Sequence, residues 1–136
     1  SDSTSPWSAE GLTVYTTYRI VKELYGEDYA REHYVDQWQK AVDDYYLNFY
    51  VRNPEYLEML PEQVQLAISN SLSQVRQYNE MPLKIYKAEQ LVGGEEAMDQ
   101  ILYGLFNREL DPMYPYLTYQ EFLDACGLTE EDLNLE

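Results

Sequence analysis

Apolar residues recur at intervals of three and four along most of the chain, and almost no stretch alternates apolar with polar residues as a strand would. The first such run extends from about Ser8 to Tyr25 and stops at Gly26, a residue that favours helix ends. A second run opens at Glu27 and weakens before Asn53-Pro54, which breaks it. The pattern therefore predicts an all-α protein.

Three more helices are predicted in the following part of the chain. Proline suits the first position of a helix, so Pro61 and Pro82 are the expected starts of two separate helices. The second of these ends at Gly93-Gly94, and a fifth helix begins at Glu95-Glu96. Among the expected inward-facing residues are Val64 in the third helix and Phe106 in the fifth.

The C-terminal part is predicted to contain a proline-bearing loop over 111–115, followed by two short helical segments. Thr118-Tyr119-Gln120-Glu121 forms a capping box that opens a helix ending at Gly127. Thr129 to Asp132 caps one last turn. The expected fold is a single domain, an antiparallel bundle of about five to seven helices. Residues 1–6 are interpreted as a linker or domain edge and 7–133 as the helical unit.

Composition supports a folded domain and excludes two classes of partner. The 136 residues are 45% hydrophobic and 15% aromatic, with 15 tyrosines, which argues against disorder. The net charge of −16 repels phosphate backbones and anionic lipid surfaces. We therefore expect neither a nucleic-acid partner nor a membrane segment, and no apolar run approaches the ~20 residues of a membrane span. No signal peptide is visible, and the compartment is left open.

Most residues that could carry chemistry have an ordinary structural interpretation. Cys126 is the single cysteine, and on an amphipathic helix it is expected to be a small core residue. His33 is the single histidine and is expected at the surface or partly packed. Gly93-Gly94 is a turn, because no strand precedes it as a phosphate-binding loop requires. The adjacent acidic residues are interpreted as solvated faces and helix starts: Asp43-Asp44, Glu95-Glu96 and Glu130-Glu131.

One segment near the N-terminus carries a family resemblance. Trp7-Ser8-Ala9-Glu10-Gly11-Leu12-Thr13-Val14-Tyr15, followed by Leu24-Tyr25-Gly26, resembles the M1 family of zinc metallopeptidases, the gluzincin aminopeptidases. The segment from Glu89 to Glu96 is similar to the helix–Gly–helix step of that family, and Thr118 to Gly127 to its Thr-x-x-x-Phe ending. The resemblance covers about Trp7 to Leu133. It implies the C-terminal helical subdomain of a thermolysin-like catalytic domain.

The resemblance implies roles for two residues and a cofactor. Glu10 matches the glutamate that is the third zinc ligand, and Tyr78 matches the catalytic tyrosine. A carboxylate completes a three-ligand zinc site that leaves one position for water. A phenol hydroxyl can donate a hydrogen bond to the oxyanion of a tetrahedral intermediate. The substrate class would be peptides. The family usually continues after this tyrosine with x-Lys-Gly or x-Lys-Ala, whereas Asn79-Glu80-Met81 stands here.

The largest departure from the family is the missing His-Glu-x-x-His helix, which supplies two imidazole ligands and the general base. It lies upstream of the ligand glutamate, where this chain has no histidine. The chain is therefore interpreted as a fragment of an aminopeptidase-like enzyme that by itself holds no zinc and hydrolyses no peptide. We expect it to self-associate through the face bearing Glu10 or Tyr78. The alternative function is a non-catalytic helical interaction module, either an M1-like pseudoenzyme or an unrelated bundle.

Overall fold

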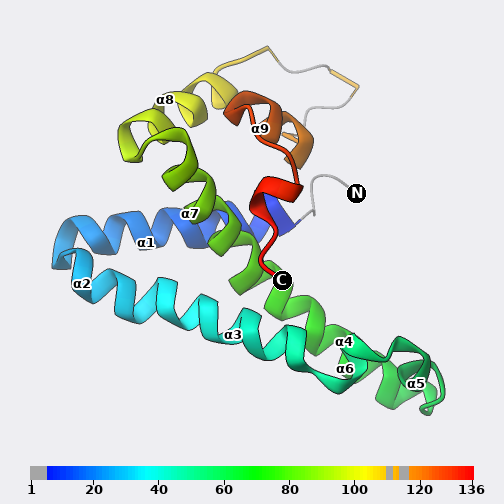
Figure 1. Cartoon of the computed structure of the whole chain (residues 1–136). Coiled ribbons are helices and arrows are strands. Elements are labelled where there is room, and N and C mark those ends of the chain that lie inside the picture. The colour runs from blue at the N-terminus through cyan, green and yellow to red at the C-terminus, as the bar shows by residue number, and fades with distance from the viewer. Residues whose placement is uncertain (1–5, 110–111, 114–116) are drawn as a thin grey trace.

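The computed structural model describes residues 6–109, 112–113 and 117–136 (Figure 1). These residues form helices and the turns between them, without a β-strand, so the predicted all-α multi-helix bundle is confirmed. No helix in these ranges has the length and apolar character that a membrane span requires. Most of the expected loop over 111–115, and the expected linker except for Pro6, lie outside the described residues. The helices are α1 (Leu12–Tyr25), α2 (Glu27–Ala30), α3 (Asp36–Leu47), α4 (Phe49–Arg52), α5 (Pro54–Glu58), α6 (Glu62–Val75), α7 (Met81–Val92), α8 (Glu95–Phe106) and α9 (Tyr119–Cys126).

The first two predicted helices lie where the sequence places them. Helix α1 stops at Gly26, whose φ of 95° lies in the left-handed region and whose N–H donates to the carbonyl of Lys22 at 2.9 Å. The chain then reverses, and α2 and α3 are joined without a break by a π-helical turn over Arg31–Val35. In Figure 1 this continuous helix runs back beneath α1.

The predicted break before Pro82 is wrong. Helices α6 and α7 form one continuous helix through a π-helical turn over Arg76–Glu80, the 76–80 turn. The N–H of Met81 donates to the carbonyl of Arg76, five residues earlier instead of four. Proline lacks an N–H and its ring crowds the preceding turn of an α-helix. The wider π turn accommodates Pro82 without ending the helix, as π turns do inside other α-helices.

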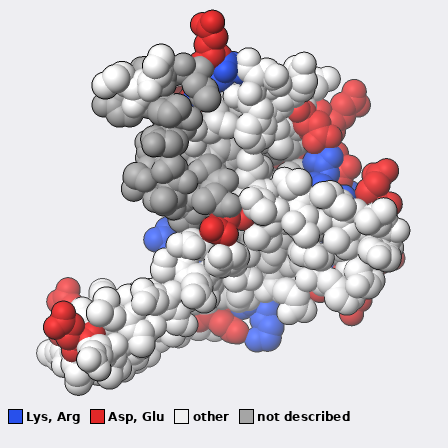
Figure 2. All heavy atoms as spheres, turned by 180° about the vertical axis from the view of Figure 1, so that it is seen from behind, with Lys and Arg blue, Asp and Glu red and all other residues white. Residues whose placement is uncertain are grey.

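A hairpin of exposed helices projects from the body of the molecule. We call residues 49–75, which comprise α4, α5 and α6, the arm, and it lies at the lower right of Figure 1. None of its residues is buried, and the prediction that Val64 packs inward is wrong, since Val64 is 45% exposed. Residues 63–75 carry no charge. Figure 2 shows the arm from behind as a mostly uncharged projection with acidic residues near its end.

The C-terminal segments fold back over α7. The N–H of Glu121 donates to the Thr118 hydroxyl, and the N–H of Thr118 donates to the Glu121 carboxylate, so the predicted capping box of α9 is confirmed. A 3-10 turn over Glu131–Leu133 follows, and its start is capped by Thr129 as expected. Phe106, at the end of α8, is 59% exposed and does not face inward as predicted.

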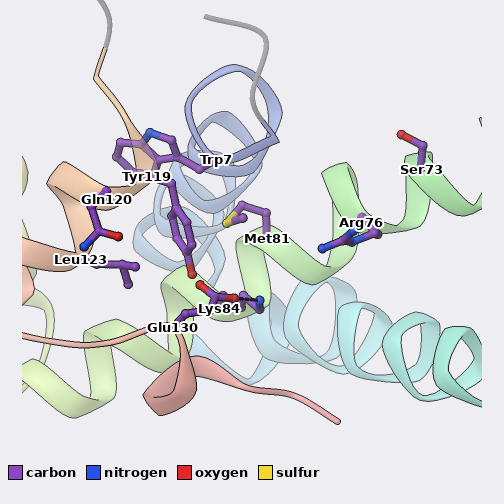
Figure 3. A pocket seen from close by; sticks show the side chains of 9 residues that line it. All are labelled: Trp7, Ser73, Arg76, Met81, Lys84, Tyr119, Gln120, Leu123 and Glu130. Carbon is purple, nitrogen blue, oxygen red and sulfur yellow. Dashed lines mark hydrogen bonds and ion pairs between the residues drawn. The ribbon is translucent and has the colours of Figure 1, made fainter. Parts of the chain in front are cut away.

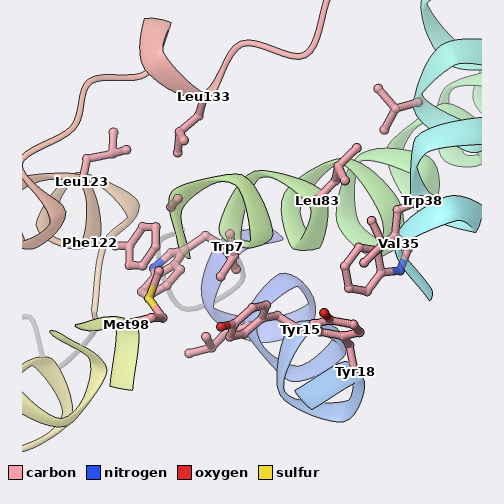
Figure 4. Packing of buried hydrophobic residues seen from close by; sticks show 14 of the residues in the cluster. Trp7, Tyr15, Tyr18, Val35, Trp38, Leu83, Met98, Phe122, Leu123 and Leu133 are labelled. Atoms are coloured by element: carbon pink, nitrogen blue, oxygen red, sulfur yellow. The ribbon is translucent and has the colours of Figure 1, made fainter. Parts of the chain in front are cut away.

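The core surrounds α7 (Figure 4). At one end Trp7 stacks on Phe122 with ring centroids 4.7 Å apart, and Met98 of α8 is fully buried beside them. At the other end Tyr18 meets the edge of Trp38 at 5.6 Å, which joins α1 to α3. The aromatic residues therefore tie together segments from both halves of the chain, including the turn that contains Glu10.

Candidate functional site

Two π-helical turns pack against each other at the centre of the molecule. The first, over Pro6–Gly11, leads directly into α1 and carries Glu10. The second is the 76–80 turn, which carries Tyr78. Single π turns within α-helices are rare and occur frequently at functional sites. The fold thus brings together the two residues that the family resemblance selects.

Glu10 and Tyr78 lie close together, because the turns that carry them pack against each other. The neighbouring Glu10 carboxylate raises the pKa of Tyr78. The tyrosine is 44% exposed, and Glu10 is half-buried. A raised pKa keeps the phenol protonated, so Tyr78 remains a hydrogen-bond donor across the neutral pH range. The catalytic roles of both residues stay predictions.

Trp7 holds the first turn in place. Its indole Nε1 donates to the carbonyl of Leu117 at 2.9 Å, and its ring is fully buried against Phe122. The turn is therefore anchored to the segment that precedes α9. This contact fixes the position of the backbone three residues before Glu10.

A buried polar cluster joins α1 to α7 and α8. Tyr15 donates to Glu89 at 2.7 Å and accepts from Arg19 at 2.8 Å, and Glu89 is 3% exposed. Arg19 also pairs with Asp99 at 2.8 Å. Burial, followed by the Glu89 carboxylate, raises the pKa of Tyr15. The sequence analysis missed this cluster, because the spacing of Glu89 on its helix does not distinguish a buried carboxylate from a solvated one.

Glu80 is a second buried carboxylate that the sequence analysis did not identify. It is 2% exposed, lies in the 76–80 turn and accepts a hydrogen bond from the Tyr46 hydroxyl of α3. The Nε atom of Arg76 donates to its other oxygen at 2.9 Å. Arg76 and Glu80 are four residues apart, a spacing typical of a helical ion pair, so the sequence could have indicated this contact. The two bonds fix the turn from which Tyr78 projects.

The remaining candidates have the structural roles that were predicted. His33 is exposed, stacks on Tyr29 with centroids 4.0 Å apart, and contacts the Tyr29 carbonyl through Nδ1 at 2.9 Å. Cys126 is half-buried against the core, and burial raises its pKa to about 11.

The described part of the chain offers one carboxylate, Glu10, where the family resemblance implies zinc. No three His, Cys, Asp or Glu side chains among the described residues are grouped as a metal site requires. Glu10 therefore fits a single ligand position and would need partners from a separate segment of polypeptide.

Comparison of the chain with protein-family models, with curated proteins and with solved structures found no match.

Proposed function

We propose that this chain is the C-terminal helical part of an M1-like zinc metallopeptidase, with Glu10 as a zinc ligand and Tyr78 as the oxyanion donor. The observation that supports the proposal is the packing of the two π-helical turns, which brings Glu10 close enough to raise the pKa of Tyr78. The residues are far apart in sequence, and the family resemblance selects both of them: Glu10 from its motif and Tyr78 from its place before the helix that ends in Gly93.

The chemistry of the pair agrees with the proposal. Glu10 would supply one carboxylate ligand, and two imidazoles would come from a separate helix. Zinc, when bound, would polarise the peptide carbonyl and activate a water molecule. Tyr78 would stabilise the developing oxyanion through its protonated hydroxyl, which the raised pKa preserves.

The first test requires the full-length protein that contains this chain. We expect a His-Glu-x-x-His motif upstream of Ser1 in that protein, and its absence would refute the peptidase assignment. Given the motif, Glu10→Gln should lower the zinc content measured by atomic emission after dialysis. Glu23→Gln, an exposed carboxylate on α1, is the matched control and should retain the metal. Retention of metal by both variants would remove Glu10 from the site.

Tyr78 is tested separately by kinetics. In the same protein, Tyr78→Phe should lower kcat by about 10²–10³, as the loss of one oxyanion donor does, while KM changes little. Tyr103→Phe is the control, since Tyr103 is 72% exposed on α8. An unchanged kcat in Tyr78→Phe with a normal zinc content would mean that another group stabilises the oxyanion.

A non-catalytic interaction module is the second candidate, and the arm favours it. Large apolar side chains are exposed along the arm, with Met59 at 75%, Leu66 at 56% and Phe49 at 55%. Exposed apolar surface of this kind marks interaction sites on many soluble proteins. A full-length protein with an intact arm but without the upstream zinc motif would favour this function over the first.

A further inference from the structure

A pocket of about 570 Å³ lies between α9 and the continuous helix α6–α7 (Figure 3). Its lining includes Arg76 and Lys84, which are eight residues apart and share one face of that helix. Tyr78 lies two residues from Arg76, an offset that turns a side chain to nearly the opposite side of a helix. The pocket is therefore separate from the Glu10–Tyr78 pair, and its volume is in the range of small-molecule sites.

The negative end of the pocket is Glu130. Its Oε1 atom forms an ion pair with Lys84, whose side chain is 8% exposed, whereas the Glu130 side chain is 55% exposed. The Tyr119 hydroxyl is buried beside this carboxylate (Figure 3), and burial and the carboxylate raise the pKa of Tyr119. A ligand can thus reach the exposed Glu130 carboxylate.

The positive end is Arg76. Its Nε atom is engaged by Glu80 at 2.9 Å, while the side chain remains 57% exposed and points toward the pocket (Figure 3). A guanidinium carries five N–H donors in a planar fork that matches a carboxylate. The bond to Glu80 uses the Nε donor, so the terminal nitrogens can bind a ligand.

The walls between the two ends are apolar, and the local charge is balanced. Met81 and Leu123 line the pocket from α7 and α9. Arg76 and Lys84 are each paired with a carboxylate, so the pocket has no excess charge of its own. The whole chain has a net charge of −16, which disfavours an anionic ligand and attracts cations without selectivity. A ligand with both charges and no net charge fits these conditions best.

We propose that this pocket, the dipolar pocket, binds a zwitterionic α-amino acid with an apolar side chain. The carboxylate of the ligand binds the Arg76 fork, its ammonium group binds Glu130, and its side chain packs on Met81 and Leu123. The proposal does not depend on the proposed peptidase function.

Titration of the isotope-labelled chain with three probes, followed by NMR, tests the proposal. L-Phenylalanine should produce saturable shifts of the Met81 methyl and Gln120 amide signals in the millimolar range. N-Acetyl-L-phenylalanine lacks the ammonium group, and L-phenylalanine amide lacks the carboxylate. Each should bind about tenfold more weakly, because each loses one charge-assisted hydrogen-bonding group. Equal binding of either derivative, or no saturable shift with L-phenylalanine, would overturn the proposal.

Two variants test which side chain of the pocket binds which charged group of the ligand. Glu130→Gln should weaken L-phenylalanine about tenfold and abolish its preference over the N-acetyl derivative. Glu55→Gln, an exposed carboxylate on α5 away from this pocket, is the control and should bind normally. Arg76→Lys keeps the charge beside Glu80 but loses the planar fork, so it should weaken L-phenylalanine and leave the amide derivative unchanged. If Glu130→Gln unfolds, Arg76→Lys still decides, since unaltered affinity for L-phenylalanine in that variant contradicts the proposal.

Discussion

The hydroxyl of Tyr46 stabilises the buried carboxylate of Glu80. It donates to the Glu80 carboxylate, and Glu80 is 2% exposed in the 76–80 turn. A buried charged acceptor that loses a donor keeps its desolvation cost without the compensating bond. The position of Tyr78, two residues earlier, therefore depends on a contact that involves neither Tyr78 nor Glu10.

We expect Tyr46→Phe to lower the free energy of unfolding by about 1–3 kcal/mol, measured by urea denaturation. Tyr45→Phe is the adjacent control on the same helix and should change it by less than about 0.5 kcal/mol. Equal effects in the two variants would show that the hydrogen bond from Tyr46 to Glu80 does not contribute to the free energy of unfolding.

Cys126 provides a pH-dependent observable. Burial raises its pKa from 9.0 to about 11, so the folded state keeps the thiol protonated while the unfolded chain releases the proton. This contribution to stability is complete below pH 9 and decreases as the pH rises from 9 to 11. At pH 8 the native thiolate fraction is about 100-fold smaller than that of the unfolded chain.

Alkylation of Cys126 at pH 8 should accordingly be about 100-fold slower in the native protein than in urea, followed by mass spectrometry. Cys126→Ser gives the background, since the chain has 1 cysteine. Similar rates in the native and unfolded states would mean that the thiol is exposed.

At the scale of elements, the glycines differ in whether the backbone conformation at their position requires glycine. Gly26 ends α1 with a φ of 95°, a conformation that L side chains rarely adopt. Gly104 lies within α8 in ordinary helical conformation, and an added Cβ there would meet nothing within 4 Å. One glycine is required by the turn, and the other weakens the helix that contains it.

Alanine at these two positions should therefore act in opposite directions. Gly26→Ala should lower the melting temperature, because the strained conformation costs about 1 kcal/mol or more. Gly104→Ala should raise stability by up to about 1 kcal/mol through helix propensity. A rise in both variants would show that α1 can end without the left-handed residue.

The elements also show how far a sequence can be interpreted. The caps at Gly26 and Thr118 are local signals, and both helix ends lie where these residues predict. Pro82 led to the wrong prediction of a helix start. A π turn is stabilised by tertiary contacts such as Tyr46 to Glu80 and has no pattern of its own in the sequence. The apolar period of α6 predicted a buried face, but periodicity does not tell whether a partner surface exists.

At the scale of the whole molecule, both the candidate site and the dipolar pocket are formed by residues that lie far apart in the sequence. Glu10 and Tyr78 were selected only through the family resemblance, and it is the packing of the two turns that brings them close together. Arg76 showed only the spacing of an ion pair with Glu80, and Glu130 was only one of two adjacent acidic residues, so neither pattern predicted a pocket. Contacts between segments distant along the chain cannot be derived from local periodicity.

The body and the arm are held by different means. The body has an aromatic core, whereas none of the residues of the arm is buried. Local opening requires the least free energy where few apolar contacts must be broken. The arm should therefore lose its helical structure at a lower temperature than the body does.

Both tryptophans of the chain, Trp7 and Trp38, are buried in the body, so tryptophan fluorescence does not report on the arm. Circular dichroism at 222 nm records helices in both parts. In a thermal scan, part of the dichroism signal should disappear before the fluorescence changes, which violates two-state unfolding. Coincident transitions would instead show that the arm and the body melt together. A stability measured from tryptophan emission alone would describe only part of this protein.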